Sequence, residues 1–168
     1  VKLFFIPLLA LSVTAIIYGA YVTLMQKDMK RLIAYSSVSH MGFVTLGIFC
    51  LNQNGIEGGI LQMINHGIIT GALFLCVGMI YERTHTRMIE DYGGLFKTVP
   101  IYIVFFTIFS LAAIGFPGMN GFIGEFLIIS GAFKANMVIA AFSILGVILG
   151  ASYMVWLYYR VALNEINP

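Results

Sequence analysis

The chain has 168 residues and a net charge of +2; 60% of its residues are hydrophobic and only 10% are charged. A water-soluble domain carries about 25% charged residues, so this composition excludes a soluble globular protein and indicates a chain surrounded by lipid. The small net charge, without a basic patch interleaved with aromatic residues, also excludes a nucleic-acid-binding module.

Five apolar segments are predicted to cross the membrane as helices. A helix rises about 1.5 Å per residue, so about 20 residues are needed to cross roughly 30 Å of hydrocarbon. Short polar turns at residues 26–31 and 52–55 separate the first three segments, and a charged surface loop follows at residues 82–97. These features predict an all-α, polytopic bundle in a single transmembrane domain. The five predicted spans are residues 3–25, 32–51, 58–81, 100–133 and 137–159.

The fourth segment is predicted to be a discontinuous helix. Residues 100–133 are too many for one span, yet a glycine-rich sequence leaves only about 15 residues on each side of it, too few for each half to cross alone. Membranes tolerate a broken helix where its freed backbone groups line a cavity or are buried in protein. Pro117 lacks an amide and its ring clashes with the preceding turn, which accounts for a break near residues 116–120. The residues assigned to the break are Pro117, Gly118 and Gly121.

The distribution of cations predicts the orientation. If the broken helix crosses once, Lys2 and Lys134 lie on one side and seven cations share the other. An excess of Lys and Arg marks the cytoplasmic or matrix side. Two short spans with an interfacial turn would only exchange Lys134 and Arg160, so length, not charge, favours the discontinuous helix over that alternative. The seven cations are Lys27, Lys30, Arg31, Arg83, Arg87, Lys97 and Arg160.

Three ionisable residues lie inside predicted spans, where charged groups are costly and mark candidate functional sites. They are His40 in the second span, His66 in the third and Glu125 in the second half of the broken helix. Counting the rise per residue places His40 about 15 Å from the positive side, and His66 and Glu125 about 13 Å from the opposite side. All three are therefore expected near the membrane midplane.

Polar neighbours extend these sites along the helices. Gln62, His66 and Thr70 recur at intervals of four residues and form one stripe. Such stripes can hold water between groups that exchange protons, and the ordinary histidine pKa of about 6.5 suits that exchange. The predicted proton-transfer residues are His40, His66 and Glu125, and the predicted supporting polar residues are Lys30, Ser36, Gln62, Asn65 and Thr70.

Small residues and cysteines are interpreted as packing residues. The glycine pairs at the ends of Gly67–Gly71 and Gly146–Gly150 predict close helix contacts. Cys50 and Cys76 lie in apolar runs without a CxxC pattern, so we expect neither a metal site nor a disulfide.

Several motifs, in this order, resemble the antiporter-like, proton-pumping subunits of respiratory complex I, the NADH:ubiquinone oxidoreductase. The multisubunit sodium/proton antiporters share the Lys-Arg-x-x-Ala-Tyr-Ser-Ser pattern, but match Ser-His-Met-Gly and Tyr-Glu-Arg-x-His-Thr-Arg less well. The resemblance covers nearly the whole chain. Its motifs are Asp28–Gly42, Gln62–Gly67, Tyr81–Arg87, Phe116–Gly118 and Gly121–Phe126.

The resemblance implies a fold of two inverted five-helix repeats, of which this chain matches the second. His40, His66 and Glu125 would belong to a hydrophilic axis that moves protons, driven by NADH oxidation elsewhere in the complex. It further implies no cofactor in this chain, lipid and other membrane-arm subunits as partners, and the mitochondrial inner membrane, or alternatively a bacterial plasma membrane. A half-channel alone should not pump, so the first repeat is expected either as a separate polypeptide or as a part missing from this sequence.

Three other functions remain open at this point. The chain could be a subunit of a sodium/proton antiporter, or a purely structural membrane half-module whose polar residues only join helices. His40 and His66 could also bind haem, since they lie on consecutive helices. No HExxH motif, nucleophile elbow or phosphate loop indicates an enzyme active site within the chain.

Overall fold

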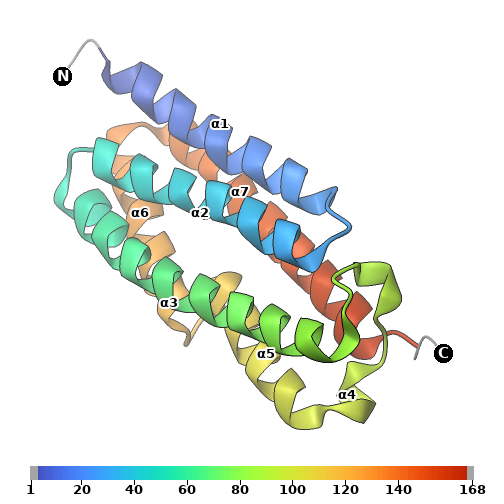
Figure 1. Ribbon diagram of the computed structural model, residues 1–168. Coiled ribbons are helices and arrows are strands. Elements are labelled where there is room, and N and C mark those ends of the chain that lie inside the picture. The colour runs from blue at the N-terminus through green and yellow to red at the C-terminus, as the bar shows by residue number, and fades with distance from the viewer. Residues whose placement is uncertain (1–3, 166–168) are drawn as a thin grey trace.

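The computed structural model describes residues 4–165 as a bundle of helices joined by short loops (Figure 1). Four helices are long and apolar enough to cross a membrane, the last of them continuing through a π-helical turn to Leu163. The predicted all-α class is confirmed. The helices are α1 (Phe5–Leu24), α2 (Met29–Phe49), α3 (Gln53–Thr84), α4 (Leu95–Thr98), α5 (Pro100–Ala113), α6 (Asn120–Ala135) and α7 (Met137–Tyr158), with a 3-10 turn at Ile89–Asp91.

The connections between α1 and α2 and between α2 and α3 are shorter than predicted, because a side-chain cap starts each following helix early. The Asp28 carboxylate accepts a hydrogen bond from the Arg31 amide at 3.0 Å, so α2 already begins at Met29. The Asn52 side chain accepts one from the Gly55 amide at 3.0 Å, so α3 begins at Gln53. The prediction of a turn over residues 52–55 was therefore wrong beyond its first residue. Asn favours both turns and helix N-caps, and here it is a cap.

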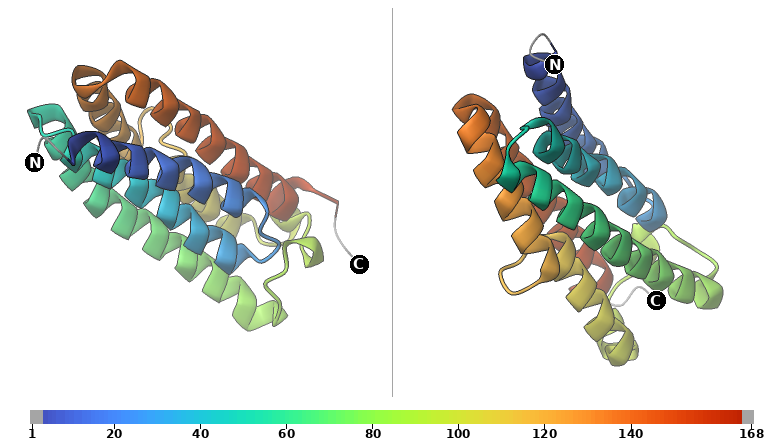
Figure 2. Two further views of the ribbon diagram at one scale, coloured as in Figure 1. Left: turned by 90° about the horizontal axis from the view of Figure 1, so that it is seen from above. Right: turned by 90° about the vertical axis from the view of Figure 1, so that its left-hand side faces the viewer.

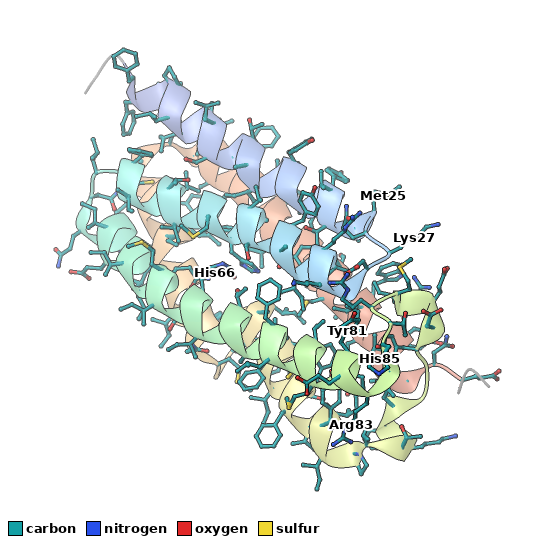
Figure 3. All side chains as sticks on the ribbon, viewed as in Figure 1. Met25, Lys27, His66, Tyr81, Arg83 and His85 are labelled. Carbon is teal, nitrogen blue, oxygen red and sulfur yellow. The ribbon has the colours of Figure 1, made fainter. Side chains whose placement is uncertain are left out.

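The charged loop after α3 is fixed to the α1–α2 turn. The Met29 amide donates to the Arg87 carbonyl at 2.9 Å, and the Ile89 amide donates to the Lys27 carbonyl at 2.8 Å. The Arg87 guanidinium lies 3.7 Å from the Asp28 carboxylate. Figure 3 places Lys27 and His85 together at this end of the bundle. Lys27 and Arg87, two of the seven cations predicted to share a side, therefore lie at the same end of the bundle. Lys2 lies outside the described residues.

Helices α5 and α6 together cross the bundle once. The Tyr102 hydroxyl of α5 donates to the Cys76 carbonyl in the second half of α3, at 3.2 Å. The Asn52 side chain, at the start of α3, donates to the Gly131 carbonyl near the end of α6, at 2.8 Å. The two short helices therefore lie at successive depths beside one long helix. The chain keeps its direction between α5 and α6 and reverses between α6 and α7 (Figures 1 and 2). The predicted discontinuous helix is confirmed.

A glycine cap ends α5. Gly115 has a φ of 70°, which favours glycine. The Phe116 amide donates to the Leu111 carbonyl at 3.1 Å, and the Gly115 amide donates to the Ala112 carbonyl at 3.2 Å. This pair of bonds is the Schellman motif, after which proline is common. The break assigned to Pro117 therefore begins two residues earlier, at a glycine.

Only one of the two predicted glycine pairs packs closely within the described residues. A Cβ atom at Gly146 would collide with Ile16 and lie 3.2 Å from Phe43, so α7 touches α1 and α2 there. Around Gly67 and Gly71 no atom of residues 4–165 would lie within 4 Å of an added Cβ. Their side of α3 has no helix packed on it in this part of the chain.

The interior consists of two apolar clusters separated by polar side chains. One cluster lies toward the cation-rich end and includes Leu32, Leu73, Phe106, Leu157 and Val161. The other lies toward the opposite end and includes Leu9, Ile16, Phe43, Leu46 and Ile128. Along α2 the two clusters are separated by the segment that contains Ser36, Ser39 and His40, all buried. We call the buried polar side chains between the clusters the polar layer.

Candidate proton-transfer site

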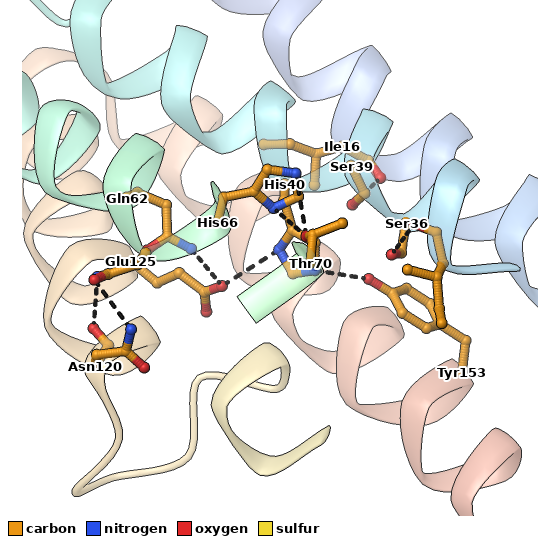
Figure 4. A network of polar contacts seen from close by, with 12 residues as sticks. Ile16, Ser36, Ser39, His40, Gln62, His66, Thr70, Asn120, Glu125 and Tyr153 are labelled. Atoms are coloured by element: carbon orange, nitrogen blue, oxygen red, sulfur yellow. Dashed lines mark hydrogen bonds and ion pairs between the residues drawn. The ribbon is translucent and has the colours of Figure 1, made fainter. Parts of the chain in front are cut away.

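The polar layer brings together side chains from four helices (Figure 4). Its centre is formed by His40 of α2, Gln62 of α3, Glu125 of α6 and Tyr153 of α7, each less than 10% exposed. Burying a carboxyl and an imidazole without polar partners is costly. Each of these groups therefore needs polar partners within the layer.

His40 is the hub of the layer. Its Nδ1 lies 3.7 Å from Glu125 Oε1, and its Nε2 lies 3.3 Å from the Tyr153 hydroxyl. A neutral imidazole has one donor and one acceptor nitrogen. When the Tyr153 hydroxyl donates to Nε2, the ring proton sits on Nδ1 and faces the carboxyl. In that tautomer the Nδ1 proton can pass to Glu125, and in the other tautomer the Tyr153 hydroxyl accepts from Nε2 instead.

Glu125 is held by an amide and accommodated by a glycine. The Gln62 Nε2 donates to Glu125 Oε1 at 3.3 Å. The Gln62 carbonyl oxygen has no hydrogen-bond partner among residues 4–165, so an acceptor remains available inside the layer. A Cβ atom at Gly115 would lie 2.5 Å from Glu125 Oε2. The glycine that ends α5 therefore also makes room for the carboxyl.

His66 continues the layer toward the outside of α3. Its ring centre lies 5.4 Å from that of His40, and its Nδ1 lies 3.2 Å from the Thr70 hydroxyl. His66 is half-buried, whereas the residues next to it, Gly67 and Ile68, are exposed. The three ionisable residues thus form one row, Glu125, His40 and His66, with its outer end near the surface of the bundle.

The remaining predicted supporting residues have separate roles: Asn65 and Ser36 form hydrogen bonds to the backbone, and Lys30 lies away from the polar layer. Asn65 donates to the Asn120 carbonyl at 2.7 Å, and Asn120 donates back to Asn65 Oδ1 at 3.1 Å, which fixes the start of α6. Ser36 donates to the Ile33 carbonyl of its own helix at 2.8 Å. Lys30 is not brought to the layer: it lines a pocket at the cation-rich end with Tyr81 and Arg87, about 15 Å along α2 from His40.

The residues assigned to the break shape the connection rather than the row. Pro117 and Gly118 lie in the segment between α5 and α6, where Gly118 has a φ of 98°. Gly121, in the first turn of α6, is so close to α5 that an added Cβ would collide with the Ala112 carbonyl. The two half-helices are therefore in direct backbone contact at the break.

Both ring nitrogens of His40 face polar side chains of the layer, one Tyr153 and the other Glu125. Within residues 4–165, no group of three His, Cys, Asp or Glu side chains could hold a metal ion.

Sequence reasoning missed Tyr153 and the role of Gly115. The sequence did contain one indication that Tyr153 faces the interior. Tyr153 continues a stripe of small residues on the side of α7 that faces the bundle, namely Ala140, Ser143, Gly146 and Gly150. Gly115 directly precedes the residues on which the proline argument was centred. Its contact with a carboxyl ten residues later depends on how the connection between α5 and α6 places the start of α6 beside the end of α5, which the spacing alone does not show.

Comparisons with known proteins agree with this architecture. Residues 4–150 match the family described as "NADH:quinone oxidoreductase/Mrp antiporter, TM". The chain is 52% identical over 167 residues to NADH-ubiquinone oxidoreductase chain 4 of Marchantia polymorpha, covering 99% of this chain and 34% of the relative. The chain thus spans about a third of the length of the curated relatives it matches.

Two solved structures share the fold. Respiratory complex I from Thermus thermophilus contains a chain that superposes with a TM-score of 0.96 at 38% identity, covering 99% of this chain and 36% of that one. The Mrp complex from Dietzia contains one with a TM-score of 0.93 at 25% identity, covering 98% and 31%. The resemblance to the antiporter-like subunits of complex I is confirmed, and the chain belongs to the transmembrane family shared by NADH:quinone oxidoreductases and Mrp antiporters.

Proposed function

We propose that this chain is part of the proton-translocating membrane arm of an NADH:quinone oxidoreductase, as the counterpart of the second half of chain 4. The observation that carries the proposal is the buried His40–Glu125 contact in the polar layer, closed on both sides by apolar clusters. Redox chemistry would occur in other subunits, and this chain would hold no cofactor. It supplies groups that bind and release protons at the middle of the membrane.

The geometry suggests how the row transfers a proton. The 3.7 Å between His40 Nδ1 and Glu125 Oε1 exceeds a hydrogen bond, so transfer requires the pair to approach by roughly 0.7 Å or a bridging water. The ring centres of His40 and His66 are 5.4 Å apart, and both ring nitrogens of His40 face other groups, so exchange between the two histidines requires a ring rotation or a bridging water. The His66 ring is oriented by Thr70. Because Glu125 lies directly under the cap of α5, its charge state is coupled to the position of the break.

The partners and membrane follow from the same proposal. The chain would assemble with other membrane-arm subunits, with the first repeat of its own subunit, and with lipid. Its cation-rich end would face the bacterial cytoplasm or the mitochondrial matrix. The mitochondrial inner membrane and the bacterial plasma membrane both fit this orientation.

Replacing His40 with asparagine is expected to lower the number of protons pumped per NADH oxidised, while the assembled complex persists. Asparagine keeps a polar group in the layer but cannot bind and release the proton that passes between Glu125 and His66. The measurement is dye-reported proton uptake by membrane vesicles, normalised to NADH oxidation.

His85→Asn is the matched control for this experiment. His85 is the third histidine and caps α3 at the cation-rich end with a φ of 56°, a conformation that asparagine tolerates. Its replacement should leave pumping unchanged. Equal pumping by both variants would contradict the role of His40, and a fall in complex abundance with normal pumping per complex would support the structural half-module instead.

Replacing Tyr153 with phenylalanine is expected to slow pumping by less than the His40 variant does. The ring still fills its buried position, but the hydroxyl that faces His40 Nε2 is gone, so both ring tautomers become available. Infrared difference spectra of the imidazole should then show a mixture of tautomers. A single unchanged tautomer with normal pumping would show that the tyrosine does not position His40.

A sodium/proton antiporter subunit is the second candidate, favoured by the match to the Mrp complex. The higher identity to the complex I chain favours the first proposal. Purification of this chain from its native membrane in mild detergent separates the two. Recovery with NADH-oxidising subunits supports the oxidoreductase, whereas recovery with antiporter chains alone and sodium-dependent transport would support the antiporter.

A further inference from the structure

A groove outside the polar layer runs along α3 and the first half of α5. Its volume is about 680 Å³, and its walls are mainly apolar. It extends from Ala72, near the middle of α3, to Arg83 at the cation-rich end. The side chains that line it include Leu75, Met79, Ile101, Tyr102, Phe105 and Phe109.

The walls of the groove are held by the protein itself. The Tyr102 hydroxyl donates across the two helices to the Cys76 carbonyl at 3.2 Å. The Tyr102 ring also stacks on Phe106, with ring centres 6.0 Å apart and planes 8° from parallel. Pro100 begins α5 at the mouth of the groove. The groove therefore has its shape before anything binds there.

Within the described part of the chain, Arg83 is the one cation among the residues that line the groove. Arg83 is exposed, and Figure 3 places it at the end of α3 beside the α4–α5 region. Among residues 4–165, no carboxylate pairs with Arg83. Arg87, four residues later and beyond the end of α3, instead contacts Asp28 and the Tyr81 ring. The Arg83 guanidinium is thus free to bind an anion, and planar guanidinium groups suit phosphate oxygens.

The length of the groove distinguishes an acyl chain from a protein helix. Ala72 and Arg83 are eleven residues apart, which is about 16 Å along a helix. One leaflet of hydrocarbon is about 15 Å thick, half of the roughly 30 Å core. A transmembrane helix would need a groove through both leaflets, whereas a lipid tail beneath a headgroup occupies one.

We propose that this groove binds one acyl chain of an anionic phospholipid whose phosphate contacts Arg83. Basic pockets between transmembrane helices on the cytoplasmic or matrix side bind anionic headgroups, and Arg83 lies among the cations of that side. The apolar walls select a lipid over free phosphate. The inference does not depend on proton transfer, because it uses none of the residues of the polar layer.

The test is photolabelling of the intact, purified complex in phosphatidylcholine vesicles. The probe is phosphatidylglycerol with a diazirine near the end of one acyl chain, compared with phosphatidylcholine carrying the same group. Mass spectrometry should locate the phosphatidylglycerol label on groove residues between Ala72 and Met79 or between Ile101 and Phe109. Replacing Arg83 with glutamine should lower this labelling about tenfold, which corresponds to about 1.4 kcal/mol, because the charge-assisted hydrogen bond to the phosphate is lost.

Three variants make the result specific. Arg83→Lys should retain most of the labelling, because it keeps the charge. Arg31→Gln, which removes another exposed cation from the same end, should change nothing. Ala72→Phe should reduce labelling by filling the groove while Arg83 is intact. Equal labelling by the two lipids, no labelling above background, or cross-links from these residues to a neighbouring protein helix would each overturn the proposal.

Discussion

Replacement of Glu125 by glutamine is expected to reduce proton pumping per NADH roughly tenfold or more, the scale of effect when a positioned proton-transfer group is lost. Glutamine has nearly the same shape and still meets the Gln62 amide and His40. It cannot bind and release a proton, however. Because the side chain is 7% exposed, bulk water cannot easily replace it. The packing of the layer, and hence assembly, should persist.

The measurement combines dye-reported pumping, quinone reduction and the amount of complex on a native gel. Glu57→Gln is the matched control, since Glu57 is an exposed carboxylate in the first turns of α3. It accepts a hydrogen bond from the Gln53 side chain at 2.8 Å. Unchanged pumping by the Glu125 variant would remove Glu125 from the proposed row. A loss of complex with normal pumping per complex would indicate that the carboxyl only joins helices.

Replacement of Gly131 by alanine is expected to destabilise the bundle by about 1–3 kcal/mol, the typical cost of overpacking. An added Cβ would lie 2.5 Å from the Gly55 amide nitrogen and 2.7 Å from its Cα. These are backbone atoms at the start of α3, so no side chain can rotate away. Separation of α3 and α6 would also weaken the 2.8 Å bond from Asn52 to the Gly131 carbonyl.

Thermal unfolding of the purified complex, followed through this subunit, measures the effect. A chain of this size loses about 2–4 °C in Tm per kcal/mol, and valine at the same position should lower it further. Gly78→Ala is the control, because no atom of residues 4–165 would lie within 4 Å of its Cβ. It should be neutral or stabilising by up to about 1 kcal/mol through helix propensity. Equal Tm values for the two variants would contradict the close contact.

Hydropathy predicted the helices well because lipid leaves the backbone no other way to satisfy its hydrogen bonds. The depth of His40, His66 and Glu125 was also predictable, since the rise per residue converts sequence position into height. It was harder to predict from the sequence which side of its helix each residue faces. Tyr153 lies at the required depth, yet only its place in a stripe of small residues shows that it faces His40.

The errors have equally local causes. Lys30 was grouped with the polar residues by chemistry, although ten residues separate it from His40 along one straight helix. The turn over residues 52–55 was predicted from Asn and Gly, but one Asn52 cap is enough to start α3. The contact of Gly115 with Glu125 depends on the connection between α5 and α6, which places the first turns of α6 against the end of α5.

The division of the interior into two apolar clusters with the polar layer between them determines where the membrane voltage acts. The two clusters are poor dielectrics in series, so the transmembrane potential falls mainly across them. Moving one charge through 100 mV is worth about 2.3 kcal/mol, so a proton travelling between the layer and one surface works against roughly half of that, about 1 kcal/mol. The membrane potential would then oppose proton uptake and proton release by nearly equal amounts. Neither step alone would work against the whole transmembrane potential.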